Sequence, residues 1–129
     1  MGGERKTIFL IEDDEILIKM YRLKLEKEGF KVKIATDGQE ALLMLQKDKF
    51  LPDLILLDII MPKMDGYTFL KEARKNNLLT SKTPIFILTN IMINNKERKI
   101  GQELGVIDFW LKSKYSPSEI VKKIIDALN

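Results

Sequence analysis

Two patterns of apolar and polar residues alternate along the chain, and the changes between them mark ten expected secondary-structure elements. Five short runs rich in branched apolar residues are typical of strands buried on both faces of a sheet. Between them lie stretches whose apolar residues recur every three or four positions, which is typical of amphipathic helices. We predict strands near 7–12, 31–35, 53–58, 84–89 and 107–111, and helices near 15–28, 38–48, 66–76, 94–103 and 117–128.

The strict alternation of strands and helices favours a single α/β domain. Because crossovers between parallel strands are right-handed, it predicts a doubly wound, five-stranded parallel sheet with five helices. Residues 31–34 (KVKI) alternate polar and apolar side chains, as in an edge strand with one solvated face. Residues 85–88 (IFIL) are apolar throughout and predict an interior strand.

Two helix starts carry the residues of a capping box, in which the N-cap and the residue three positions later exchange hydrogen bonds with the main chain. Asp37 with Glu40 marks the second expected helix. Ser116 with Glu119 marks the fifth, where Pro117 occupies the first helical position. We expect a capping box at both starts.

The expected helices differ in their apolar faces. The helix near 94–103 offers the core chiefly Ile100 and Leu104, so we predict that it is the loosest. The helix near 15–28 carries apolar residues over more than half of its circumference, which indicates either a broad packed face or an exposed partner site. The last helix has one continuous apolar stripe, formed by Ile120, Val121, Ile124, Ile125 and Leu128.

Composition excludes several kinds of chemistry. The chain has no cysteine and no histidine, so disulfides, thiolate metal sites and a histidine base are excluded, and any phosphohistidine must belong to a partner. The net charge of +3 is small and lysines are interspersed with glutamates, which argues against direct nucleic-acid binding. No apolar run approaches the roughly 20 residues of a membrane span, so we expect a cytoplasmic protein without membrane insertion. We expect residues 1–5 to be a native tail or a cloning remnant, and residues 6–129 to be the domain.

Acidic residues follow two of the buried strands. Glu12, Asp13 and Asp14 come directly after the first strand, and Asp58 follows the third. If these strands are neighbours, Glu12, Asp13 and Asp58 converge at the carboxyl edge of the sheet, where two carboxylates about 4 Å apart repel by roughly 4 kcal/mol at an effective dielectric constant of about 20. Hard oxygen ligands without histidine or cysteine favour Mg²⁺ as the counter-ion.

A hydroxyl and a lysine are expected at the same edge, because Thr89 ends the fourth strand and Lys112 follows the fifth. A carboxylate beside Mg²⁺, a lysine and a hydroxyl is suited to accept a phosphoryl group. Attack by Asp58 on phosphorus would give an aspartyl phosphate.

Four segments carry a resemblance to a known family: residues 10–14 (LIEDD), 58–66 (DIIMPKMDG), 87–89 (ILT) and 108–112 (DFWLK). In this order and spacing, they resemble a response-regulator receiver domain of two-component signalling, similar to single-domain chemotaxis regulators, from about Lys6 to Leu128. The resemblance implies a flavodoxin-like strand order of 2-1-3-4-5.

The resemblance also implies roles. Asp58 would be the phosphoacceptor, Glu12 and Asp13 the acidic pair, and Ile60 the source of a main-chain oxygen for Mg²⁺. Thr89 and Lys112 would bind the phosphoryl group, and Thr89 would act with Phe109 as the switch.

Several positions depart from the family pattern. Asn90 stands where many receivers have a smaller residue, and could limit the inward movement of Thr89. Ser113 stands where proline is common, so the loop after Lys112 is expected to differ. Ile60 and Ile91 are apolar where other receivers have polar groups that position water, so we predict slow self-dephosphorylation.

Some residues also have a structural interpretation. We expect Asp14 to cap the first helix, Asp65 and Gly66 to form a turn and helix cap, and Trp110 to lie in the core. Ordinary half-buried packing remains an alternative for Phe109.

We expect a signalling domain and not an enzyme, one that catalyses only its own phosphorylation and slow dephosphorylation. The resemblance implies a sensor histidine kinase or a histidine phosphotransfer protein as phosphoryl donor. Phosphorylation would remodel a face formed by the fourth helix and the fifth strand and helix. This face would dock an unknown downstream protein. The alternatives are a phosphorylation-silent interaction scaffold and a receiver excised from a larger regulator.

Overall fold

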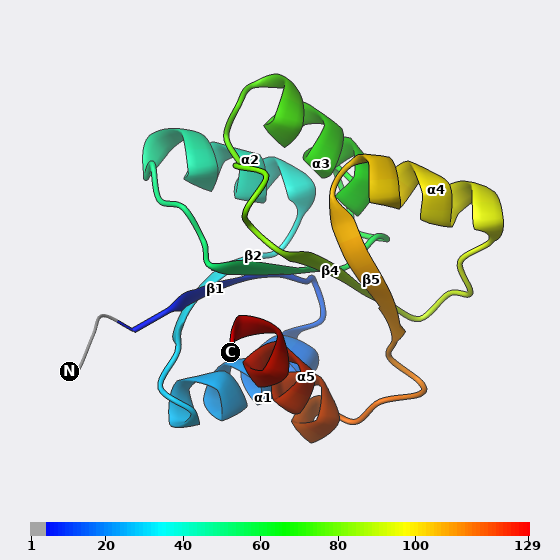
Figure 1. Cartoon of the computed structure of the whole chain (residues 1–129). Helices are drawn as coiled ribbons and strands as arrows, with labels where there is room; N and C mark the ends of the chain where they lie inside the picture. Colours follow the sequence, from blue (N-terminus) through cyan, green and yellow to red (C-terminus); the bar gives the residue numbers. More distant parts are fainter. Residues whose placement is uncertain (1–4) are drawn as a thin grey trace.

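The computed structural model describes residues 5–129, and each predicted element is present with both ends within one residue of its expected position (Figure 1). Of the expected tail, residues 1–4 lie outside the described residues. The elements are β1 (Thr7–Ile11), α1 (Glu15–Lys27), β2 (Lys31–Ala35), α2 (Gly38–Lys47), β3 (Leu54–Leu57), α3 (Gly66–Lys75), β4 (Ile85–Thr89), α4 (Asn95–Glu103), β5 (Val106–Leu111) and α5 (Pro117–Leu128).

The strands form one parallel sheet in the order β2-β1-β3-β4-β5. This confirms the flavodoxin-like, doubly wound fold. In this register Ile11 pairs with Leu57, and Thr89 pairs with Leu111. The residues that follow β1 and β3 therefore emerge side by side at the carboxyl edge of the sheet.

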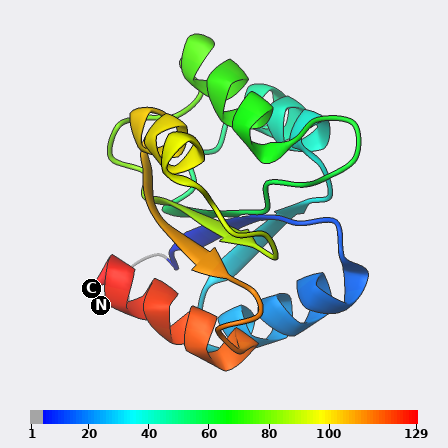
Figure 2. The ribbon, with the colours of Figure 1, turned by 90° about the vertical axis from the view of Figure 1, so that its right-hand side faces the viewer.

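Helices cover both faces of the sheet. Figures 1 and 2 show α2, α3 and α4 on one side and α1 and α5 on the other. Because successive strand residues point to opposite faces, Phe9 and Ile55 pack in the cluster under α2 and α3, whereas Ile8 and Leu54 pack against α1 and α5. Trp110 is buried as expected and stacks on Phe86 with ring centroids 4.3 Å apart.

The two predicted capping boxes have different outcomes. Ser116 and Glu119 form one at the start of α5. At α2, Asp37 accepts from the Glu40 N–H, but Glu40 accepts from the N–H of Thr36, so the second box is wrong. Both caps have extended backbone, but φ is −158° at Asp37 and −72° at Ser116, and this difference accompanies the shift by one residue of the main-chain donor that Glu40 reaches.

The outer surface of α1 retains apolar side chains, as its sequence pattern indicated. Ile16, Met20 and Leu23 are 73%, 38% and 65% exposed. Among the described residues, no helix combines the length and the apolar character needed to cross a membrane.

Candidate functional site

Glu12, Asp13 and Asp58 converge at the carboxyl edge of the sheet. The Asp58 N–H donates to the Ile11 carbonyl at 2.9 Å, which continues the pairing of β1 and β3 by one residue beyond the strands. One carboxylate oxygen from each of the three acids lies within 4.8 Å of the others. Glu12 and Asp58 are buried and Asp13 is exposed, so the cluster opens to solvent on the side of Asp13.

Lys112 brings a positive charge into this cluster. Its Nζ lies 2.7 Å from Glu12 Oε1 and 3.1 Å from Asp58 Oδ2. The Lys112 N–H donates to the Thr89 carbonyl at 2.7 Å, so the ends of β4 and β5 fix the origin of its side chain. The predicted convergence of strand-end residues therefore includes the lysine.

The carboxylates are held in an environment that disfavours two negative charges. Burial, with a smaller contribution from Asp58, raises the pKa of Glu12 from 4.5 to about 7, against the opposing effect of Lys112. Burial also raises the pKa of Asp58, again opposed by Lys112. Burial alone would lower the pKa of Lys112, but its hydrogen bond to Glu12 and the charges of both acids outweigh burial and raise it. One lysine thus offsets part of the repulsion, and a further cation would offset more.

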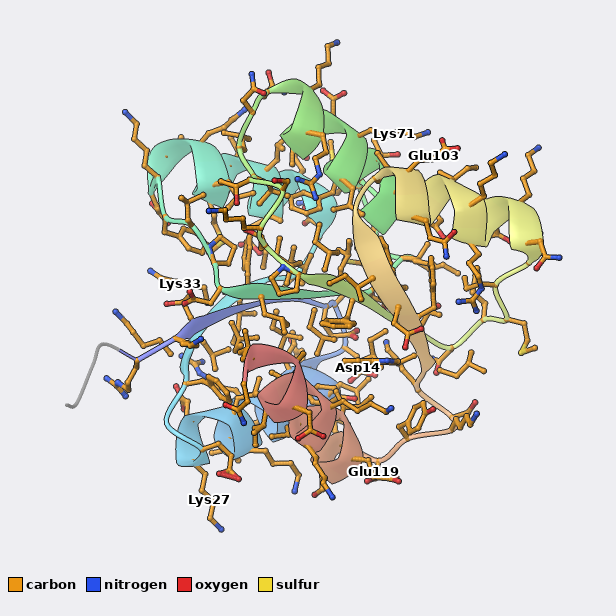
Figure 3. The ribbon with its side chains drawn as sticks, viewed as in Figure 1. Asp14, Lys27, Lys33, Lys71, Glu103 and Glu119 are labelled. Carbon is orange, nitrogen blue, oxygen red and sulfur yellow. The ribbon has the colours of Figure 1, made fainter. Side chains whose placement is uncertain are left out.

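The donor set fits magnesium. Glu12 Oε2 accepts from the Asp14 N–H at 3.0 Å, whereas the buried Oε1 has the Lys112 ammonium, 2.7 Å away, as its partner. An oxygen of this kind beside two further carboxylates is a hard ligand set without nitrogen or sulfur, which suits Mg²⁺. Asp14 lines one pocket with these three acids. Its Oδ1, however, accepts from the N–H groups of Ile16 and Leu17, so Asp14 caps α1 as expected (Figure 3).

Thr89 and Ile60 line the acidic pocket together with the carboxylates and Lys112. Thr89 is buried, and its Oγ1 accepts from the Ile91 N–H at 3.3 Å. Ile60 and Ile91 are 58% and 37% exposed at the mouth of the pocket, and Asn90 is exposed beside them. The structure therefore brings together every residue predicted to bind metal or phosphoryl group.

Phe109 does not line the acidic pocket. It lies in a neighbouring pocket with Trp110, Tyr115 and Arg98, and Thr89 lines both pockets. The Arg98 guanidinium lies over the Phe109 ring, 4.8 Å from its centroid, which sequence reasoning missed. Thr89 is therefore the residue that the two pockets share.

The loop after Lys112 is compact without proline. The Lys114 N–H donates to the Leu111 carbonyl at 3.1 Å, and Ser113 is exposed. Every peptide bond of the described chain is trans.

Comparisons with known proteins agree with this geometry. Residues 8–125 match the family model described as the response regulator receiver domain. The chain is 34% identical over 119 residues to the alkaline phosphatase synthesis transcriptional regulatory protein PhoP of Bacillus subtilis, which covers 92% of this chain and 47% of that protein. It is 38% identical over 117 residues to the transcriptional regulatory protein CpxR of Klebsiella pneumoniae, at 91% and 47% coverage.

The chain spans about half the length of the curated relatives it matches. Among solved structures, the chemotaxis protein CheY4 of Vibrio cholerae superposes with a TM-score of 0.80 at 26% identity, covering 95% of this chain and 98% of that one.

Proposed function

This chain belongs to the response regulator receiver domain family of two-component signalling, and we propose that it signals by taking a phosphoryl group onto Asp58. The observation that carries the proposal is the position of Lys112, whose Nζ lies 3.1 Å from Asp58 Oδ2 and 2.7 Å from Glu12 Oε1. A lysine held against a buried carboxylate nucleophile supplies positive charge where the oxygens of a transferring phosphoryl group would gather.

The phosphoryl donor is a phosphohistidine of a sensor histidine kinase or a histidine phosphotransfer protein, as the family implies. Because this chain contains no histidine, the phosphohistidine belongs to the partner. A carboxylate oxygen of Asp58 forms a bond to phosphorus as the nitrogen–phosphorus bond breaks, and the electron pair of that bond returns to the imidazole of the donor. Lys112 stabilises the negative charge of the phosphoryl oxygens, and the Thr89 hydroxyl donates to one of them.

Magnesium would be held by the carboxylates of Glu12, Asp13 and Asp58 and by the main-chain carbonyl of Ile60. When bound, Mg²⁺ supplies positive charge that offsets the repulsion between these carboxylates and an incoming phosphoryl group. The support for this assignment is the cluster of carboxylate oxygens within 4.8 Å, in which Lys112 is, among the described residues, the one cation that contacts Glu12 and Asp58.

Phosphorylation would then be read out through Thr89 and Phe109. Movement of the Thr89 side chain toward the phosphoryl group frees space in the neighbouring pocket, into which the Phe109 ring turns. Because Phe109 contacts α4, this shifts the population of the surface formed by α4, β5 and α5 toward a second arrangement. This proposal is supported by Thr89 lining both pockets.

We also propose that the phosphorylated state is long-lived. Ile60 and Ile91 line the mouth of the acidic pocket and have no polar group to orient an attacking water. We expect a lifetime of minutes or longer that is shortened by Ile60→Asn and Ile91→Glu but not by Ile16→Asn, which alters an exposed isoleucine that is not among the pocket's lining residues. A lifetime of seconds in the unaltered protein, unchanged by either pocket variant, would contradict the proposal.

Residues 6–129 would therefore be a signalling module that acts through protein docking and not on an external substrate. The relatives are named as transcriptional regulatory proteins of about twice this length. The same module would serve either as a diffusible receiver or as the receiver part of a longer regulator.

The experiment that tests the proposal is intact mass after incubation with a small acyl phosphate, with and without Mg²⁺. We expect a gain of one phosphoryl group that requires both Mg²⁺ and Asp58. Asp58→Asn should abolish it, whereas Asp126→Asn, which changes an exposed carboxylate on α5, should not. The absence of any gain would instead favour a phosphorylation-silent interaction scaffold.

A further inference from the structure

The loop between β3 and α3 carries two of the proposed magnesium ligands, Asp58 and Ile60. Ile59 and Met61 are buried on the α2 and α3 side of the sheet, whereas Ile60 between them is exposed. Buried neighbours on both sides of Ile60 fix the path of the first part of the loop. The second part, residues 62–65, is held differently.

The far end of the loop is fixed by a close approach of main chain to main chain. The Gly66 N–H donates to the Ile59 carbonyl at 2.8 Å. A Cβ at position 66 would lie 2.5 Å from the Asp58 carbonyl oxygen and 3.0 Å from Ile59 Cα. Gly66 has no positive φ, so the need for glycine comes from this contact and not from backbone conformation.

A second glycine makes an equivalent contact from a helix that does not line the acidic pocket. Gly38, the first residue of α2, donates its N–H to the Met64 carbonyl at 3.0 Å. A Cβ at position 38 would lie 2.7 Å from that oxygen and 3.1 Å from the Asp65 carbonyl oxygen. Asp37, directly before it, faces Lys63 with 4.0 Å between carboxylate and ammonium. The start of α2 and its N-cap thus lie against three successive residues of the loop, with a hydrogen bond to the middle one, Met64.

From these contacts we propose that Gly38 is a positioning residue for the acidic site. The start of α2 holds residues 63–65, these residues lead directly into Gly66, and Gly66 lies against the main chain of Asp58 and Ile59. The loop is then held at both ends in the shape that presents Asp58 and Ile60 together. This inference rests on the proposed function, because its consequence is an effect on magnesium binding.

The test compares Gly38→Ala with Gln39→Ala, an exposed position one residue further along α2. Mutation of groups that orient metal ligands typically weakens metal affinity by about 10–100-fold. We therefore expect Gly38→Ala to weaken Mg²⁺ binding about tenfold, as measured by calorimetry. Gln39→Ala should leave the affinity unchanged. In the metal-free protein, Gly38→Ala should also shift the NMR amide resonances of Asp58, Ile59 and Ile60.

A purely structural role for Gly38 predicts a different result. Gly38→Ala would then lower the unfolding temperature while leaving both the Mg²⁺ affinity and the three amide resonances as in the unaltered protein, which would overturn the inference. If the unaltered protein binds no Mg²⁺, the proposed function fails, and the amide resonances of the metal-free variant still decide whether Gly38 positions the loop.

A measurement on the unaltered protein covers the case in which Gly38→Ala does not fold. Linkage requires that, if the Gly38 contact favours the magnesium-bound loop, magnesium in turn strengthens the contact. Amide hydrogen exchange of Gly38 should therefore slow on addition of Mg²⁺ by more than that of Glu119, whose N–H is bonded to Ser116 in the first turn of α5. Equal slowing at both amides would contradict the inference.

Discussion

The helices α4 and α5 flank the same edge strand, β5, but are held in place by different means (Figure 2). In α5, Ile120, Val121 and Ile124 are buried, and a capping box with proline at the first position fixes the start. In α4 the only buried residue is Gly101. Because burial of apolar surface is the main source of helix stability in a folded protein, α5 is anchored and α4 is not.

A few specific contacts replace burial in α4. The Tyr67 hydroxyl donates to the Glu97 carbonyl at 3.3 Å, and Arg74 Nε donates to the Leu104 carbonyl at 3.0 Å. Both donors come from α3, which lies beside α4 in Figure 3, where Lys71 and Glu103 mark the two helices. The neutral bond from Tyr67 contributes about 1 kcal/mol and the bond from the charged Arg74 about 1.5–3 kcal/mol. Because the several buried apolar side chains of α5 contribute about 1.5–3 kcal/mol each, α4 can be rearranged at a lower cost than α5. The helix next to the proposed switch residue is thus the one that is easiest to move.

The largest expected effect on the free energy of unfolding comes from replacing one isoleucine by alanine in each of the two helices. We expect Ile124→Ala in α5 to lower the free energy of unfolding by about 2–5 kcal/mol, because a fully buried isoleucine leaves a cavity. Ile100→Ala in α4 removes a partly exposed side chain and should cost roughly 1 kcal/mol. Denaturant unfolding of both variants measures the difference.

Local stability provides the control for this comparison. Amide hydrogen exchange should be slow in α5 and fast in α4 of the unaltered protein, since α4 opens without global unfolding. Similar losses for the two variants, together with equal protection of the two helices, would show that α4 is as firmly held as α5.

The difference between these helices could be predicted from the sequence, and so could the convergence of strand-end residues at the acidic site. Apolar periodicity exposed the stripe of α5 and its absence in α4, and the strand ends placed Glu12, Asp58 and Lys112 at one edge. Contacts that depend on the packing of distant elements were not readable, such as Arg98 over Phe109 or Gly38 against Met64. A signal for the latter was present, since Asp37-Gly38 and Asp65-Gly66 repeat one pattern, an aspartate cap before a glycine at the first helical position.

The next effect concerns Gly101, the buried residue of α4. A Cβ at this position would lie 2.5 Å from Phe109 Cζ, and Tyr67 Cε1 lies 3.5 Å away on another side. Alanine normally stabilises a helix interior by about 1 kcal/mol relative to glycine. Here we expect Gly101→Ala to lower the free energy of unfolding by up to about 2 kcal/mol, because overpacking typically costs about 1–3 kcal/mol and outweighs the gain in helix propensity.

The matched control is Gln102→Ala, at the exposed neighbouring position, which should be neutral or stabilising by a few tenths of a kcal/mol. A displaced Phe109 ring should also change the NMR resonances of the neighbouring pocket residues. A stabilising Gly101→Ala would mean that α4 moves away from Phe109 without cost, which would make the helix even looser than proposed.

A smaller effect is expected from the contact between Arg98 and the Phe109 ring, since such pairs contribute about 0.5–1 kcal/mol at exposed sites. Arg98→Ala should weaken α4 by this amount and speed its amide exchange, whereas Lys99→Ala, at an exposed position of the same helix, should not. A double-mutant cycle with Phe109→Leu isolates the pairwise contribution. A coupling energy of zero would remove Arg98 from the contacts that hold α4.

The smallest expected effect is a dependence of stability on pH that distinguishes the start of α5 from the start of α4. The hydrogen bond from the Ser116 N–H, with a smaller contribution from the Ser116 side chain, holds the pKa of Glu119 below its usual value of 4.5. At pH values between the folded pKa and 4.5, the folded protein therefore binds fewer protons at Glu119 than the unfolded chain does. This contribution to stability is fully present above the unfolded pKa of 4.5 and is lost as the pH falls through the folded pKa. In α4 the N-cap Asn94 accepts from the Glu97 N–H, but Glu97, at the position that corresponds to Glu119, does not complete a capping box.

Glu119→Gln tests this assignment, because glutamine keeps the capping geometry without the charge. Other carboxylates titrate equally in both proteins, so the difference between their unfolding free energies isolates Glu119 as the pH is lowered from neutrality. That difference should shrink on acidification, and the first turn of α5 should lose amide protection while the first turn of α4 keeps its own. Parallel curves for the two proteins would show that the Glu119 carboxylate adds nothing to the anchoring of α5 beyond what a neutral side chain provides.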